Sequence, residues 1–126
     1  AGKTKAGGTP DAEADEKPQN VYDDHAKMNF RVGEIVDCKI VENSKKLLCS
    51  QVKIGDKTVQ ICSGIRAAYT PEQMIGKKVM VIVNLAPRKM AGLLSQGMLL
   101  CAEGADGRLS LMTPDDSGIE AGSEIC

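Results

Sequence analysis

The residues best suited to chemistry lie in one basic stretch, residues 83–98, which reads VNLAPRKMAGLLSQGM. Arg88 and Lys89 directly follow Pro87, and Gly92 lies three residues further on. Proline lacks an N–H and glycine adopts conformations closed to other residues, so both interrupt a regular strand. Apolar runs flank the stretch on both sides. A basic loop between two strands can contact the phosphates of a nucleic acid, and we expect this one to do so.

Charge is unevenly distributed along the chain. The formal net charge of the 126 residues is −1, which favours no class of partner. Nine basic residues and two acidic ones lie between residues 45 and 89, whereas residues 90–126 carry one arginine and six acids. The middle of the chain can therefore form a positive face. The alternative is that these lysines are ordinary solvated strand ends.

Nothing in the sequence predicts catalysis, a cofactor or a metal. His25 is the only histidine, and it has no Ser, Cys or acidic partner at a recognisable catalytic spacing. The five cysteines form no C-x-x-C pair, so we expect no zinc site. Most of them lie in apolar runs, which is typical of free thiols in a reducing compartment, so we expect a cytoplasmic protein. No signal peptide and no span long enough for a membrane is present, and we expect no membrane partner.

Two regions are predicted. Residues 1–20 consist mainly of Gly, Pro, Ala and charged residues without an apolar period, so we expect a disordered linker or tail. Since the first residue is Ala, we expect that the chain was processed or cut from a longer one. Residues 21–126 form the predicted domain. The chain is 42% apolar but only 2% aromatic, so the core of that domain must be aliphatic.

Alternation of apolar and polar residues predicts a mainly β domain. The expected strands cover residues 30–41, 47–54, 57–63, 79–84, 97–102 and, as a short addition, 109–112. Gly33 is expected to mark a bend or bulge in the first strand. Thr70 as N-cap, Pro71 in the first turn and Gly76 at the end predict one short helix before the fourth strand.

The dipeptide Gly-Asp at residues 55–56 predicts a two-residue hairpin turn. That register places Val52 opposite Val59 and Cys49 opposite Cys62. It assigns to the inner face Leu48, Ser50, Val52, Ile54, Val59 and Ile61, and to the outer face Cys49, Gln51, Lys53, Thr58, Gln60 and Cys62. The register allows a disulfide between the two cysteines, but we expect two reduced thiols.

Three meandering strands, a helix, two further strands and a C-terminal extension match the plan of a five-stranded OB-fold barrel, an all-β fold. OB-folds bind oligonucleotides on strands two and three, between the loop joining strands one and two and the loop joining strands four and five. Those loops are residues 42–46 and 85–95 here. The basic residues expected on this surface are Lys45, Lys46, Lys53, Arg88 and Lys89. Because the sheet carries few aromatic residues for base stacking, a folded RNA read through its backbone is the expected ligand.

Six ordered segments together resemble the tRNA-binding domain family. That family includes the C-terminal domain of methionyl-tRNA synthetases, free-standing tRNA-binding proteins and the endothelial monocyte-activating polypeptide II module. The segments are residues 30–35 (FRVGEI), 46–48 (KLL), 62–65 (CSGI), Tyr69 with 76–79 (GKKV), 84–90 (NLAPRKM) and 95–100 (SQGMLL). The resemblance implies tRNA-binding roles for Lys46, Ser63, Asn84, Lys89, Ser95 and Met98. The chain departs from the family pattern at Ala91, where many members are basic, and at Leu94, where many are acidic.

The resemblance implies a non-catalytic, structure-specific tRNA-binding module and a homodimer. The match is nearest to the C-terminal appendix of a methionyl-tRNA synthetase, where the module would raise tRNA affinity and residues 1–20 would be the linker. Two alternatives remain open at this point. One is a peptide-binding, chaperone-like OB-fold dimer, and the other is a module that only dimerises.

Overall fold

Antiparallel strands make up most of the described chain, which is residues 28–126 of a computed structural model. The strands are β1 (Phe30–Ile40), β2 (Leu48–Ile54), β3 (Lys57–Ser63), β4 (Lys78–Ile82), β5 (Arg88–Met90), β6 (Leu93–Ser95), β7 (Met98–Leu99), β8 (Cys101–Glu103) and β9 (Leu109–Leu111). One short helix, α2 (Pro71–Met74), lies among them. The predictions for the tail at residues 1–20 and for His25 lie outside the described residues.

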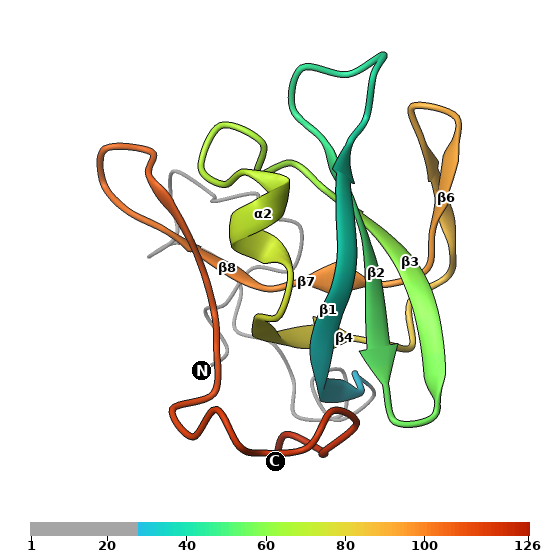
Figure 1. Cartoon of the computed structure of the whole chain (residues 1–126), viewed down its shortest axis with the longest axis vertical. Coiled ribbons are helices and arrows are strands. Elements are labelled where there is room, and N and C mark those ends of the chain that lie inside the picture. Colours follow the sequence, from blue (N-terminus) through green and yellow to red (C-terminus); the bar gives the residue numbers. More distant parts are fainter. Residues whose placement is uncertain (1–27) are drawn as a thin grey trace, which may run out of the picture.

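The main sheet has the strand order β3-β2-β1-β4-β7 and curls into an OB-like barrel, as Figure 1 shows. The curled sheet closes where the segment after β6 meets β3, and there the Gln96 N–H donates to the Gln60 carbonyl at 2.7 Å. Two small hairpins, β5–β6 and β8–β9, are added to this barrel. The predicted fold class, with one short helix between the third and fourth strands, is confirmed.

The β2–β3 hairpin has the predicted register. Val52 pairs with Val59, and Ser50 pairs with Ile61. Gly55 has a φ of +66° in the turn, a conformation that glycine adopts without strain. The period-two pattern and the turn residues thus agree on one pairing, which leaves little freedom for slippage.

The irregularity predicted in β1 is present but is displaced from Gly33. The β1–β2 register shifts between Ile35 and Asp37 instead. Gly33 is needed for a different reason, which is close packing. A Cβ at this position would lie 2.6 Å from Val52 Cγ1 and 3.0 Å from Val81 Cγ2.

The helix α2 begins with the predicted cap. Thr70 Oγ1 accepts the Gln73 N–H at 3.2 Å, and Gln73 Oε1 accepts the Thr70 N–H at 2.9 Å. This reciprocal capping box satisfies two backbone donors at the helix start. Met74 on this short helix is fully buried in the aliphatic core.

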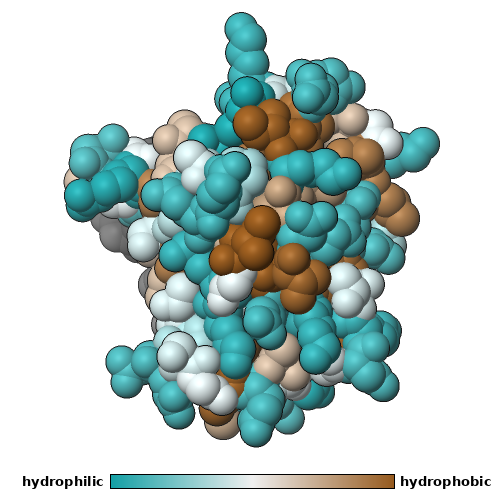
Figure 2. Space-filling view, viewed as in Figure 1, coloured by the Kyte–Doolittle hydropathy of each residue, from teal (hydrophilic) through white to brown (hydrophobic). Residues whose placement is uncertain are grey.

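The core is aliphatic, as the composition predicts. Its fully buried members include Ile35, Leu48, Val52, Ile61, Met74, Val79, Val81 and Ile82. A few apolar side chains remain on the surface, among them Val36 and Ile75. Figure 2 shows apolar atoms grouped near the middle of a largely hydrophilic face. No helix among residues 28–126 is long and apolar enough to cross a membrane.

The C-terminal extension completes the edge of β1 where β2 has ended. The Val32 N–H donates to the Ser123 carbonyl at 2.9 Å, and the Gly122 N–H donates to the Val32 carbonyl at 2.6 Å. One step further along, the Ile125 N–H donates to the Phe30 carbonyl at 2.9 Å. Residues 122–125 therefore act as a short extra strand, which we call the C-terminal clasp.

Candidate nucleic-acid interface

Residues 85–95, predicted as an open loop, contain the β5–β6 hairpin. Arg88 pairs with Ser95, and Met90 pairs with Leu93. Ala91 and Gly92 form the turn with φ angles of +50° and +84°. Two successive positive φ values are the requirement of a type I′ turn, the turn that best matches the twist of a hairpin. The basic pair Arg88-Lys89 is therefore held on a strand.

Hydrogen bonds fasten this hairpin to β3. The Cys62 N–H donates to Ser95 Oγ at 2.9 Å, and Gln60 Nε2 donates to the Leu94 carbonyl at 2.9 Å. Ser95 is only 4% exposed and its Oγ also donates to the Gly97 carbonyl at 3.3 Å. The hydroxyl of Ser95 therefore helps to position the hairpin on β3, and its predicted contact with a ligand stays a prediction.

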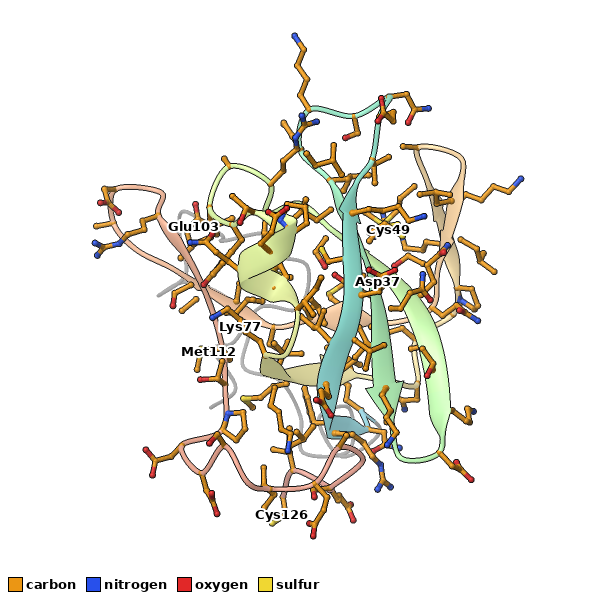
Figure 3. All side chains as sticks on the ribbon, in the orientation of Figure 1. Asp37, Cys49, Lys77, Glu103, Met112 and Cys126 are labelled. Carbon is orange, nitrogen blue, oxygen red and sulfur yellow. The ribbon has the colours of Figure 1, made fainter. Side chains whose placement is uncertain are left out.

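A small apolar cluster lies beneath the hairpin. It consists of Val41, Cys49 and Cys62, with Leu47, Met90 and Leu93 packed against them. Val41 and Leu47 flank the 42–46 loop, so this loop and the hairpin share one support. Both rise from the same end of the barrel in Figure 1, and Figure 3 places Cys49 at this end.

The cluster corrects one prediction. Cys49 and Cys62 were assigned to the open outer face, but they are 3% and 5% exposed. The hairpin covers them. Because residues 85–95 were predicted to be an open loop, the sequence did not predict that they pack over these two cysteines. The two residues lie opposite each other as predicted, and both are free thiols. Burial, and then the neighbouring Cys49, raise the pKa of the Cys62 thiol to about 11, so it remains protonated at neutral pH.

The 42–46 loop is ordered by its own polar groups. Ser44 Oγ accepts the N–H groups of Lys46 and Leu47, each at 3.2 Å. Arg66 reaches over from the segment after β3, and its Nη1 donates to the Ser44 carbonyl at 2.6 Å. Sequence reasoning did not assign Arg66 to the site. Its only signal was its place in the basic middle of the chain, and the contact depends on the tertiary fold.

Four predicted cations therefore share one end of the molecule. Lys45 and Lys46 are exposed on the 42–46 loop, and Arg88 and Lys89 are exposed on the hairpin. We call these four residues the basic loop surface. Lys89 pairs with Leu94, and the pleat directs both side chains away from the apolar cluster under Met90 and Leu93.

The remaining predicted residues do not join this surface. Lys53 lies near the far end of β2, five residues from Leu48, which is roughly 17 Å along a strand. Ser63 lies opposite Leu48 at the same end of the barrel as the 42–46 loop, but its Oγ is buried and has no hydrogen-bond partner among the described residues. Met98 is half-buried in β7 opposite Ile82.

The outer face expected between the two loops is partly occupied. Gln51 and Gln60 are half-buried, and Gln51 Nε2 donates to Gln60 Oε1 at 3.2 Å. Gln60 in turn holds the hairpin through Leu94. The hairpin therefore covers part of the face on β2 and β3 that was predicted to bind the ligand, and binding by the rest of that face stays a prediction.

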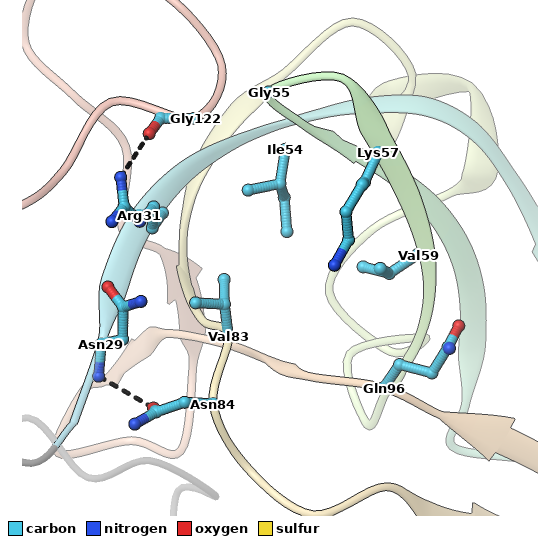
Figure 4. A pocket seen from close by; sticks show the side chains of 10 residues that line it. All are labelled: Asn29, Arg31, Ile54, Gly55, Lys57, Val59, Val83, Asn84, Gln96 and Gly122. Carbon is cyan, nitrogen blue, oxygen red and sulfur yellow. Dashed lines mark hydrogen bonds between the residues drawn. The ribbon is translucent and has the colours of Figure 1, made fainter.

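Asn84 lies at the opposite end of the barrel. Its Oδ1 accepts the Asn29 N–H at 2.8 Å, at the edge of a hollow of about 410 Å³ (Figure 4). Arg31 and Lys57 line the same hollow. Sequence reasoning assigned neither of these two cations to a site, since only the folded barrel brings β1 and the β2–β3 hairpin together here.

No metal centre is evident in the part of the chain that the structure describes. Residues 28–126 hold no group of three His, Cys, Asp or Glu side chains arranged to bind an ion.

Replacing Ser95 with alanine should destabilise the domain by about 1–3 kcal/mol, because the buried Cys62 N–H loses its acceptor. Urea unfolding followed by circular dichroism measures this loss. Ser110→Ala is the matched control, since Ser110 is exposed in β9. Full stability of Ser95→Ala with weaker RNA binding would contradict the positioning role and indicate a direct contact.

The sequence of this chain is similar to those of several known proteins. Residues 30–124 match the family model described as a putative tRNA binding domain. The chain is 48% identical over 107 residues to a methionine–tRNA ligase of Chlorobaculum tepidum, covering 85% of this chain and 15% of that protein. It is 50% identical over 99 residues to the methionine–tRNA ligase of Methanocaldococcus jannaschii, covering 79% of this chain and 15% of that protein. The chain thus spans only a small part of these relatives.

Solved structures show the same fold. A MetRS-related protein from Pyrococcus horikoshii superposes with a TM-score of 0.81 at 31% identity, covering 87% of this chain and all of that one. A CsaA chaperone protein from Picrophilus torridus superposes with a TM-score of 0.77 at 29% identity, covering 86% of this chain and all of that one.

Proposed function

The chain belongs to the putative tRNA binding domain family, and from that premise we propose that it binds folded tRNA through the basic loop surface without catalysing a reaction. The observation that carries the proposal is the joint support of the two basic loops. One apolar cluster packs against both the base of the loop that carries Lys45 and Lys46 and the hairpin that carries Arg88 and Lys89. Cations on ordered loops can match a fixed arrangement of phosphates at a lower entropic cost than cations on mobile loops.

The shape of this surface favours a structured RNA. The described residues include only Phe30 and Tyr69 as aromatics, and only Phe30 lies in a strand, so the sheet offers few platforms for single-stranded bases. The hydroxyl of Tyr69 is also engaged, since it accepts the Leu111 N–H at 2.9 Å. Contacts to phosphates and 2′-hydroxyl groups remain, and these read the shape of a folded RNA.

We further propose that the chain is the tRNA-binding part of a methionyl-tRNA synthetase. There it would raise the affinity for tRNA and leave the chemistry to the catalytic region, in the cytoplasm. High identity to methionine–tRNA ligases, of which the chain spans 15%, supports this proposal. We also propose a homodimer, and the exposed apolar side chains of Val36 and Ile75 support it. Light scattering should then give twice the chain mass of 13.4 kDa.

An electrophoretic mobility shift with folded, unfractionated tRNA tests the central proposal. We expect a shifted band that an unfolded polypeptide does not compete away. The logarithm of the affinity should fall linearly with the logarithm of the salt concentration, by about 0.9 per phosphate contact. Absence of a shift at low salt, or an affinity that salt leaves unchanged, would reject tRNA binding through these cations.

Peptide binding is the second candidate. The fold shared with a protein named as a CsaA chaperone favours it, as does Leu94, which is 45% exposed beside Lys89. An apolar side chain among cations could contact an extended, partly acidic peptide. Displacement of tRNA by the unfolded polypeptide in the mobility-shift experiment would favour this candidate.

A further inference from the structure

The mouth of the barrel holds a hollow that is separate from the basic loop surface. It lies between the start of β1, the β2–β3 turn and the end of β4, as Figure 4 shows. Its volume of about 410 Å³ falls within the range of pockets that hold small molecules. Barrel mouths are among the places where such pockets occur.

Aliphatic side chains form the floor of the hollow. Ile54, Val59 and Val83 line it, and each is half-buried and packed against the main core. Ile54 and Val59 belong to the inner face of the β2–β3 hairpin, near its turn. A floor of this kind favours contact with the flat, weakly hydrated face of a base or with a ribose.

The rim presents hydrogen-bond donors. Arg31 Nη1 donates to the Gly122 carbonyl at 3.1 Å, and a guanidinium has further N–H groups for a ligand. Gln96 Oε1 accepts the Gln60 N–H at 2.9 Å, so the amide nitrogen of Gln96 is the part left to donate. Lys57 adds an exposed ammonium group.

Acceptors are scarce at the same rim. Asn84 Oδ1 is engaged by the Asn29 N–H, and the lining residues that the structure describes include no Asp or Glu, although exposed Asp56 lies in the turn between Gly55 and Lys57. The nearest acid along the clasp is Glu124, which lies opposite Arg31 in a backbone bridge. Two cations and an amide donor above an apolar floor suit a phosphate joined to an apolar ring.

We propose that this hollow binds one unstacked nucleotide of the bound RNA, with the phosphate on Arg31 and Lys57 and the base or ribose on the aliphatic floor. The inference rests on the proposed RNA binding and adds a second contact to it. Lys57 at the start of β3 lies roughly 20 Å from the other end of that strand, near the 42–46 loop, whereas Gln96 on the opposite rim directly follows Ser95, the pairing partner of Arg88. A folded RNA with one extruded nucleotide can reach both places, because unpaired nucleotides at loops and ends are free to leave the stack.

Two substitutions test the rim without disturbing the core. Lys57→Gln removes one cation, and Gln96→Glu keeps the acceptor for Gln60 while placing a negative charge where the phosphate would lie. Both residues are exposed, and circular dichroism should show an unchanged fold. The control is Arg108→Gln, which removes one exposed charge from the β8–β9 turn. In fluorescence anisotropy at 0.1 M salt, each rim variant should bind unfractionated tRNA about eightfold more weakly, and the control less than twofold.

A second measurement examines the hollow without RNA. Adenosine 5′-monophosphate should shift the amide resonances of Asn29, Arg31 and Gly55 in the full chain, and both rim variants should lose these shifts. Equal shifts from inorganic phosphate alone would overturn the assignment of the floor to a base or ribose. Shifts from N-acetyl-leucyl-glutamate in place of the nucleotide would overturn it in favour of an acidic peptide.

The outcomes separate this inference from the function on which it rests. If the wild-type chain binds tRNA and the rim variants bind like the control, the inference fails and the basic loop surface stands. If the wild-type chain binds no tRNA, the proposed function fails. Nucleotide-induced shifts would then still support a nucleotide pocket, and their absence would overturn it.

Discussion

Replacing Arg88 and Lys89 together with alanine should weaken tRNA binding about 50-fold near 0.1 M salt. Each phosphate contact contributes about 0.9 to the slope of log affinity against log salt, which is roughly an eightfold effect between 0.1 M and 1 M. Two lost contacts should therefore also reduce the slope by about two units. The loss should be uniform across tRNA sequences, because phosphate contacts carry no base information.

The structure supplies the control for this experiment. Arg88 and Lys89 are both exposed on β5, so the double variant should keep its stability. Arg108→Ala removes one exposed positive charge in the segment between β8 and β9, and it should lower affinity less than twofold. Anisotropy titrations at several salt concentrations measure both quantities. An unchanged slope in the double variant, or an equal loss in Arg108→Ala, would contradict the basic loop surface as the tRNA site.

Substitution of Gly122 by alanine should lower the free energy of unfolding by about 3 kcal/mol. Gly122 has a φ of +101°, where a Cβ alone costs about 1–2 kcal/mol. The added Cβ would also lie 2.7 Å from the Gly55 nitrogen and 2.8 Å from its Cα, so the backbone must move. That movement strains the C-terminal clasp on β1 and adds a cost of similar size.

Gly107→Ala separates the two contributions. Gly107 has a φ of +84°, but a Cβ there would meet nothing within 4 Å. It should lose only the conformational part, about 1–2 kcal/mol. Urea unfolding followed by circular dichroism gives both values. Equal destabilisation of the two variants would show that the close approach of Gly122 to Gly55 carries no cost.

The features of this fold that could be predicted from the sequence are those that depend on local side-chain patterns. The alternation around Val52 and Val59, with Gly55 in the turn, is sufficient to define the β2–β3 register. Thr70 and Gln73 define the helix start through a capping box that depends on a few neighbouring residues. Each of these features depends only on residues that are close together in the chain, so it can be predicted from a single sequence.

The β5–β6 hairpin could not be predicted in the same way. Ala91 occupies a position with positive φ where Asn, Asp or Gly would signal a type I′ turn. Its strands have only three residues each, too few for a clear period. Missing the hairpin led directly to the wrong exposure for Cys49 and Cys62, since the hairpin is what covers them.

Only part of the candidate site could be predicted from the sequence, for a related reason. The basic pairs at Lys45-Lys46 and Arg88-Lys89 were visible as charge next to loops, and the barrel plan placed those loops at one end. The hollow depends on Arg31, Lys57 and Asn84, which come from three elements distant in sequence. No local sequence pattern predicts that these three residues lie close together, because only the closed barrel brings them together.

The C-terminal clasp has a consequence for the order of folding. The carbonyl of Phe30, in the first described strand, accepts its clasp hydrogen bond from Ile125, about 95 residues later in the chain. Contacts between distant residues raise the relative contact order, and chains rich in them fold slowly, in milliseconds to seconds. During synthesis, the hydrogen bonds along this edge of β1 cannot form completely until residues 122–125 have been made. A nascent chain that stops short of the clasp therefore exposes an unpaired strand edge, to which other chains can add.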